Sequence, residues 1–252
     1  MVYIDAHTHF GGKMPQGIPP ERVDECIRMM DQIGMDAIVT SPPRAAASPD
    51  RTFGDANVQL QEAMKKHPKR IYGLARINPR YRARAVEEAE KALVDGFFGI
   101  KFHPRNEGYA IDNRELVFPI MRKVQEHGGL VLFHTGCPVY SHPTLVGYVA
   151  EHFPDVPIIL GHMGSEYPDD AILVARWFDN VVVDSSFAGV NAIEKAVEIA
   201  GPEKVVYASD YPQGSMEIDT LRVKLADISD RDKELILGRN IRRILDSVAK
   251  ER

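Results

Sequence analysis

Two histidines near the start of the chain form the triplet His7-Thr-His9. The triplet follows a short apolar run that reads as a strand. Because successive side chains of a strand point to opposite faces, residues two apart share a face. Both imidazoles can therefore reach one ion, and neutral imidazole is the commonest metal ligand in proteins. The spacing predicts part of a metal site.

Three further residues complete a plausible ligand set. His134 in Phe-His-Thr-Gly and His162 in Leu-Gly-His-Met-Gly each end an apolar run close to a glycine, which lets the backbone turn sharply. Asp210 in Ala-Ser-Asp-Tyr-Pro follows the last apolar run. Taken singly, such an aspartate more often caps a helix. Several histidines together with a carboxylate suit zinc or a similar divalent ion.

Four basic residues are candidates to hold a substrate carboxylate: Lys101, His103, Arg76 and Arg105. Lys101 and His103 lie in Gly-Ile-Lys-Phe-His at the end of an apolar run. Arginine suits a carboxylate through its bidentate geometry. The alternative for both arginines and for Lys101 is a solvated loop charge or an ion pair at the rim.

Eight short apolar runs, rich in β-branched residues, alternate with stretches of 3.6-residue periodicity, the pattern of repeated βα units. The predicted strands are Val2 to His7, Asp36 to Ser41, Ile71 to Ile77, Phe97 to His103, Leu130 to His134, Pro157 to His162, Val181 to Ser185 and Val205 to Ser209. The predicted helices are Glu21 to Ile33, Asp55 to Lys66, Ala83 to Val94, Arg114 to Glu126, Thr144 to His152, Asp169 to Phe178, Ala192 to Ala200, Leu221 to Ala226 and Asp230 to Val248.

Near-continuous apolar strands are typical of parallel sheets covered on both faces. With no Gly-rich fingerprint after the first strand, eight consecutive units predict a (β/α)8 TIM barrel rather than an open sheet. Barrel active sites lie where strands end, which is where the candidate residues stand. In a closed barrel the eighth strand neighbours the first, so Asp210 can meet His7 and His9. The loop Ser41 to Pro49 is the least patterned segment and a candidate lid.

Composition bounds the remaining possibilities. The 252 residues, 44% apolar and 27% charged, suit one soluble domain over residues 1–252. A net charge of -5 without a dense basic run makes nucleic acid an unexpected partner, and no apolar stretch is long enough to span a membrane. Cys26 and Cys137 make no disulfide framework, and no leader pattern precedes the first strand. We therefore expect a cytoplasmic protein.

Five motifs together carry a family resemblance: Asp5-Ala-His-Thr-His9, Gly99-Ile-Lys-Phe-His-Pro104, His134-Thr-Gly, Leu160-Gly-His-Met-Gly164 and Ala208-Ser-Asp-Tyr-Pro212. In this order the chain resembles the amidohydrolase superfamily, above all its amidohydrolase 2 branch of metal-dependent hydrolases and aminocarboxymuconate-semialdehyde-type decarboxylases. The closing segment Ile236 to Leu245 is also similar to the family's last helix.

The resemblance implies that His7, His9, His134 and Asp210 bind one metal ion and that His162 is an acid/base or orienting residue. Lys101 stands near the place of a carboxylated lysine that bridges two metals in some members, but the pattern is closer to the mononuclear branch. Zinc is the expected ion, with manganese, iron or cobalt as alternatives.

We expect a metal-dependent hydrolase in which activated water attacks an amide, lactone, ester or imine of a small, carboxylate-bearing molecule. Asp210 would carry the proton and His162 would steady the developing charge. The alternative is a non-oxidative decarboxylase of an unsaturated or aromatic carboxylic acid, because the same ligands serve both reactions. A non-catalytic metal-binding barrel is a lesser alternative. The sequence is compatible with a homo-oligomer and does not identify the substrate.

Overall fold

The computed structural model describes residues 2–47 and 52–250, and its strands form an eight-stranded parallel sheet in chain order. The strands are β1 (Ile4–His9), β2 (Ala37–Ser41), β3 (Ile71–Arg76), β4 (Gly99–Phe102), β5 (Leu130–Phe133), β6 (Ile158–Leu160), β7 (Val181–Asp184) and β8 (Val205–Val206). Each strand coincides with an apolar run that predicted it. The expected (β/α)8 TIM barrel is confirmed.

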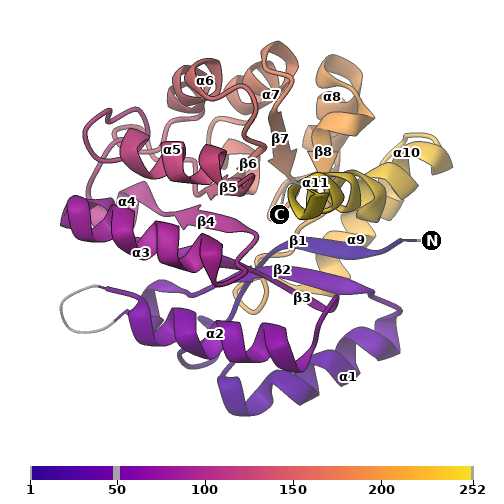
Figure 1. Cartoon of the computed structure of the whole chain (residues 1–252). Helices are drawn as coiled ribbons and strands as arrows, with labels where there is room; N and C mark the ends of the chain where they lie inside the picture. Colours follow the sequence, from indigo (N-terminus) through magenta and orange to yellow (C-terminus); the bar gives the residue numbers. More distant parts are fainter. Residues whose placement is uncertain (1, 48–51, 251–252) are drawn as a thin grey trace.

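Helices surround these strands, and the last helix lies across one end of them (Figure 1). The helices are α1 (Val23–Ile33), α2 (Gly54–Lys66), α3 (Ala83–Val94), α4 (Pro104–Glu107), α5 (Phe118–Glu126), α6 (Pro143–His152), α7 (Pro168–Trp177), α8 (Val190–Ala200), α9 (Met216–Leu225), α10 (Asp230–Glu234) and α11 (Asn240–Lys250). A π-helical segment, Leu235–Arg239, joins the last two. None of the described helices is both long enough and apolar enough to cross a lipid bilayer.

Backbone hydrogen bonds close the seam between the last strand and the first. The ladder of β8 covers only Val205–Val206, but the chain beyond it continues alongside β1. The N–H of Asp210 donates to the carbonyl of His7 at 2.8 Å, and the N–H of His9 donates to the carbonyl of Tyr211 at 2.8 Å. The barrel is therefore nearly closed, and the segment that contains Asp210 lies against the end of β1.

Two apolar clusters stabilise the barrel, one between strands and helices and one inside the ring of strands. The inner cluster contains inward-facing residues of β1, β2, β3, β5, β6, β7 and β8. The C-terminal helix α11 contributes four buried side chains to it: Ile241, Ile244, Leu245 and Val248. Because these residues pack with Ile4, the first residue of β1, α11 plugs the amino end of the barrel.

The helix predicted between the fourth and fifth strands begins four residues later than the periodicity indicated. The pattern placed its start at Arg114, whereas α5 begins at Phe118. The side chain of Asn113 accepts hydrogen bonds from the N–H groups of Glu115 at 3.1 Å and Leu116 at 3.0 Å. An asparagine side chain that satisfies the next backbone donors stabilises a turn, and so delays the helix.

The candidate lid between β2 and α2 is described only in part. Residues 41–47 include a single 3-10 turn, Arg44–Ala46. Ser48 and Pro49, the last residues of the predicted lid, lie outside the described residues. The described part leaves the carboxyl end of β2, so it belongs to the rim of the barrel mouth.

Candidate metal centre

An extra residue in β1 turns both histidines of the His-Thr-His triplet into the barrel. The register of β1 against β2 shifts between Asp5 and Thr8, where β1 carries one residue more than its partner. Because side chains alternate along a strand, one extra residue exchanges the faces beyond it. Ile4 before the shift and His9 after it therefore both face the interior, and His7 faces the same way.

Three donor atoms converge at the mouth: Nε2 of His7, Nε2 of His9 and Oδ1 of Asp210. The carboxylate oxygen lies 3.0 Å from the His9 nitrogen and 3.3 Å from the His7 nitrogen. The three atoms lie within 4.8 Å of one another, and all three side chains are buried. Asp210 adopts a left-handed φ of 57° as the chain leaves the eighth strand. Three predicted ligands thus meet at one point.

This arrangement fits a divalent cation. Oδ1 of Asp210 has no hydrogen-bond partner within the described chain, although two imidazole nitrogens stand close to it. A buried carboxylate oxygen without a partner is costly, and a coordinated cation would satisfy it. Burial opposes ionisation of Asp210, but nearby His9 and His7 outweigh it and hold the pKa of this carboxyl below its usual range. The carboxylate is therefore ionised and available as a ligand.

Asp184, the last residue of β7, orients His7 from behind. Its Oδ2 accepts a hydrogen bond from Nδ1 of His7 at 2.8 Å, which leaves Nε2 facing the donor group. Its Oδ1 accepts from the N–H of His162 at 2.8 Å and from the hydroxyl of Ser186 at 2.6 Å. His7, His162 and Asp184 also form a compact group that could hold a metal. The short His7–Asp184 bond favours an orienting role for this carboxylate.

His162 and His134 form a hydrogen-bonded pair beside the donor group. Nε2 of His162 lies 2.9 Å from Nδ1 of His134, and Nδ1 of His162 lies 2.8 Å from the hydroxyl of Ser186. Burial lowers the pKa of both imidazoles, so the neutral forms are favoured. The ring of His134 also stacks on that of His103, with centroids 3.8 Å apart. His134 therefore stands next to His162 rather than within the three-atom group.

Lys101 is fully buried inside the mouth. Its Nζ lies 2.7 Å from Nε2 of His7. Burial lowers the pKa of Lys101 to about 7, although Asp210 and Asp184 oppose this effect. Burial and the charge of Lys101 together lower the pKa of His7 well below its usual value. This lysine can therefore exchange a proton near neutral pH beside a candidate metal ligand.

The two arginines predicted to bind a substrate carboxylate lie in different surroundings. Arg76 is buried, and its Nη2 donates to Oε1 of Glu107 at 2.6 Å while its Nη1 donates to the carbonyl of Pro42 at 3.1 Å. Its guanidinium also lies 4.5 Å from the ring centroid of Phe53. Arg105 is exposed on α4. Their role towards substrate stays a prediction, whereas the Nζ of Lys101 lies 2.7 Å from a nitrogen of the donor group.

Sequence reasoning assigned no role to Asp5 or Glu107. Asp5 is buried and accepts hydrogen bonds from the N–H groups of His7 and Ser209, both at 3.1 Å. Burial raises the pKa of Asp5 to about 8. It joins the two strand ends that carry the donor atoms, and its place in the Asp-x-His-x-His motif was a usable signal. Glu107, in a short helix after β4, had no such signal.

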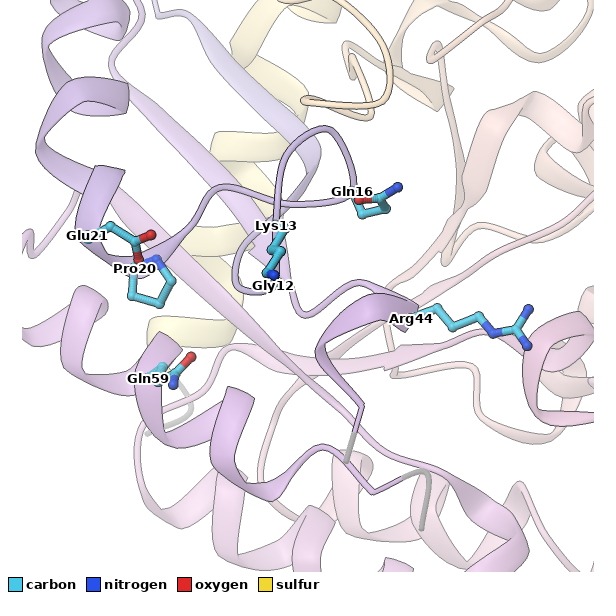
Figure 2. A pocket seen from close by; sticks show the side chains of 7 residues that line it. All are labelled: Gly12, Lys13, Gln16, Pro20, Glu21, Arg44 and Gln59. Atoms are coloured by element: carbon cyan, nitrogen blue, oxygen red, sulfur yellow. The ribbon is translucent and has the colours of Figure 1, made fainter. Parts of the chain in front are cut away.

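A cleft of about 890 Å³ opens among the segments that follow β1 and β2. Figure 2 shows its lining, which comes from the loop after β1, the 3-10 turn before α1, the 3-10 turn after β2 and α2. The lining residues are Gly12, Lys13, Gln16, Pro20, Glu21, Arg44 and Gln59. No ligand candidate is among these, so the cleft is not the metal centre.

A family model described as amidohydrolase matches residues 4–246. No curated protein sequence matches the chain. A structure of an uncharacterised TIM-barrel protein from Bordetella bronchiseptica superposes with a TM-score of 0.81 at 17% identity, covering 99% of this chain and 100% of that one.

Two enzymes of named activity have the same fold. The 5-carboxyvanillate decarboxylase of Sphingomonas paucimobilis has a TM-score of 0.76 at 16% identity, with coverage of 97% and 99%. The dihydroxybenzoic acid decarboxylase of Polaromonas sp. JS666, with bound manganese and the inhibitor 2-nitroresorcinol, has a TM-score of 0.76 at 17% identity and 97% coverage of each chain. At such identity the likeness establishes the fold.

The prediction of a metal-dependent hydrolase is corrected by these findings, because the similar structures of named activity are decarboxylases. The physical reason for the error is that metal ligands and acid/base residues are common to both reactions. The motifs identified the candidate ligands. They contained no information on whether the substrate is hydrolysed or loses carbon dioxide.

Proposed function

Because the chain belongs to the amidohydrolase family, we propose that it is a metal-dependent, non-oxidative decarboxylase of a small aromatic or unsaturated carboxylic acid. The observation that carries the proposal is the convergence of His7, His9 and Asp210 at the mouth of a barrel shared with two decarboxylases. The buried amine of Lys101 beside this group supports an anionic substrate.

We assign the metal to Nε2 of His7, Nε2 of His9 and Oδ1 of Asp210. The sequence motifs make His134, which lies beside His162 and outside this three-atom group, the expected fourth ligand. When bound, a divalent ion supplies a Lewis acid that polarises a substrate oxygen and favours negative charge in the adjoining ring. One ion is proposed. Zinc and manganese both accept two imidazoles and a carboxylate, and manganese occupies the Polaromonas enzyme.

Lys101 is proposed to hold the carboxylate that leaves. Its pKa of about 7 rises when an anion approaches, since an opposite charge favours the protonated form. The substrate carboxylate would thereby recruit the charge that binds it. Arg76 is committed to Glu107 and so serves better as a fixed part of the wall.

Asp210 is proposed to carry the proton that replaces carbon dioxide. The carboxyl group transfers its proton to the ring carbon bearing the substrate carboxylate, and a C–H bond forms there. The C–C bond then breaks, its electron pair returns to the ring, and carbon dioxide leaves. The proton on Asp210 comes from a substrate hydroxyl or from solvent. The low pKa of Asp210 makes its protonated form a strong acid.

The test is product analysis on the metal-replete protein with dihydroxybenzoates, 5-carboxyvanillate and non-aromatic unsaturated acids. We expect release of one carbon dioxide per substrate, and in D2O one deuteron at the vacated carbon. Asp210→Asn preserves the size of the side chain and should abolish release. No carbon dioxide from any acid, with one metal ion bound per chain, would contradict the proposal.

A matched pair of lysine variants tests the carboxylate site. Lys101→Met removes the charge and should raise KM more than it lowers kcat, whereas Lys101→Arg should retain part of the binding. An unchanged KM in Lys101→Met would remove Lys101 from the substrate site without touching the metal assignment.

A further inference from the structure

Phe187 is a half-exposed aromatic residue at a mouth whose other central side chains are buried. It follows β7 directly after Ser185 and Ser186, and 52% of it is exposed. Its ring centroid lies 5.8 Å from that of His162, which is 6% exposed. One side of this ring therefore packs against His162, while about half of the residue is exposed.

The backbone of Phe187 is held in a conformation that bulky residues avoid. Its φ is 60°, in the left-handed region. For a bulky residue this conformation costs free energy and persists only when its surroundings enforce it. Its N–H donates to Oδ1 of Asp219 at 3.2 Å, and Ala188 N–H donates to the carbonyl of Ser185 at 3.0 Å. The turn is thus fixed on both sides of the phenyl ring.

The partner of the Phe187 N–H is itself anchored. Asp219 is 2% exposed, and its Oδ1 accepts from Nη1 of Arg222 at 2.6 Å, both residues belonging to α9. This buried carboxylate accepts hydrogen bonds from both an arginine and the backbone N–H of Phe187. Moving the turn would leave a buried polar group without a partner, so these bonds hold the turn in place.

The loop after β8 also shapes the space around the ring. A Cβ placed on Gly214 would lie 3.2 Å from Cε1 of Phe187 and 2.0 Å from the carbonyl oxygen of Ser209. Only glycine lets this loop approach both groups. The same loop begins at Asp210, whose carbonyl accepts the N–H of Gly214 at 3.1 Å. The phenyl ring therefore stands between His162 and the loop that starts at the proposed proton carrier.

An exposed phenylalanine on a protein surface usually needs no explanation. Phe187 differs because its left-handed backbone, the bond of its N–H to a buried carboxylate and the close approach of Gly214 together restrict where its ring can lie. Fixed aromatic faces gain most from flat, conjugated partners, which stack with an offset. A saturated ring of the same size offers no π face and stands puckered.

We propose that Phe187 forms an aromatic wall of the substrate site and selects flat, conjugated acids over saturated ones. The inference rests on the proposed decarboxylase function and narrows its substrate class. Phe187 contacts the ring of the substrate, and Asp219 acts as a positioning residue that holds the wall in place.

The test compares binding of benzoate and cyclohexanecarboxylate, which share a carboxylate and six ring carbons, to the metal-replete protein by competition calorimetry. Phe187→Ala and Phe187→Leu should each lower the preference for benzoate about three- to tenfold, since stacking contributes beyond the apolar area. Phe187→Leu keeps apolar volume, so it also serves if the alanine variant does not fold.

Trp177→Ala is the matched control, because Trp177 is also exposed but ends α7, before the amino end of β7 rather than after its carboxyl end. It should leave the preference unchanged. An unaltered preference in both Phe187 variants, with metal content intact, would overturn the aromatic wall even if carbon dioxide is released. A lowered preference without release of carbon dioxide from any acid would support the wall and refute the decarboxylase.

Discussion

The two ends of the barrel are equally buried and chemically opposite. At the amino end, α11 inserts Ile241, Ile244, Leu245 and Val248 among the inward-facing apolar residues of the strands. At the carboxyl end, His7, Lys101 and Asp184 are buried to the same degree, and their polar atoms are hydrogen-bonded to one another. Apolar contact stabilises one end by removing surface from water, while the other end needs partners for its charges.

This difference separates stability from chemistry along the same strands. Truncating an apolar side chain at the amino end should lower the free energy of unfolding without altering the donor set. The carboxyl end can lose a nitrogen atom and keep its fold while losing the donor set. In TIM barrels generally, the amino-terminal face contributes to stability and the carboxyl-terminal face carries the reactive residues.

The largest effect is expected from His7→Ala. Loss of one donor atom should lower metal affinity and turnover by more than about a hundredfold, because loss of an outer partner alone costs about 10- to 100-fold. Metal per chain, measured by elemental analysis after chelation and replenishment, should fall while the far-ultraviolet dichroism stays unchanged. His67→Ala is the control, since His67 bonds Asp24 away from the mouth. Unchanged stoichiometry would remove His7 from the ligand set.

Leu245→Ala tests the opposite end. Leu245 is 1% exposed in the inner cluster, so its truncation should lower the free energy of unfolding by about 2–5 kcal/mol. Metal affinity should be unaffected, because no donor atom moves. Denaturant unfolding of the metal-free protein measures the first effect. Val94→Ala, at an exposed position on α3, should change stability by less than about 0.5 kcal/mol. Equal losses in both variants would mean that α11 is not a plug.

Asp184→Asn should have a smaller effect at the mouth. The amide keeps the shape but offers a weaker acceptor to Nδ1 of His7, so metal affinity should fall about 10- to 100-fold. Competition with a chelator of known affinity gives the measurement. Asp179→Asn, which alters an exposed carboxylate, should have no effect. If Asp184→Asn instead lowers the number of bound ions from two to one, Asp184 is a ligand of a second metal.

The smallest effect concerns the two thiols. Cys26 lies on the buried face of α1, and burial raises its pKa to about 12, whereas Cys137 is partly exposed in the loop after β5. Since the thiolate is the reactive form, iodoacetamide near neutral pH should label Cys137 and leave Cys26 unmodified until the protein unfolds. Peptide mass spectrometry distinguishes the two sites. Early labelling of Cys26 would show that the layer under α1 opens readily.

The apolar runs located all eight strands because buried parallel strands leave an unbroken hydrophobic record. Strand ends then located His7, His9 and Asp210, since barrel closure follows from the strand count. The role of Asp184 could not be read, because an outer partner is recognised only by the atom it contacts. Nor could the sequence separate hydrolysis from decarboxylation, because the two reactions share their ligands.

The irregularity between Asp5 and Thr8 lets β1 contribute both to the apolar core and to the metal centre. Before the irregularity, Ile4 faces inwards and packs in the inner apolar cluster. After it, His7 and His9 face inwards as candidate metal ligands. In regular alternation the same residues would place His7 and His9 on the face opposite to Ile4, towards the helices. The candidate metal centre therefore depends on the register shift in β1 as much as on the histidines that this strand carries.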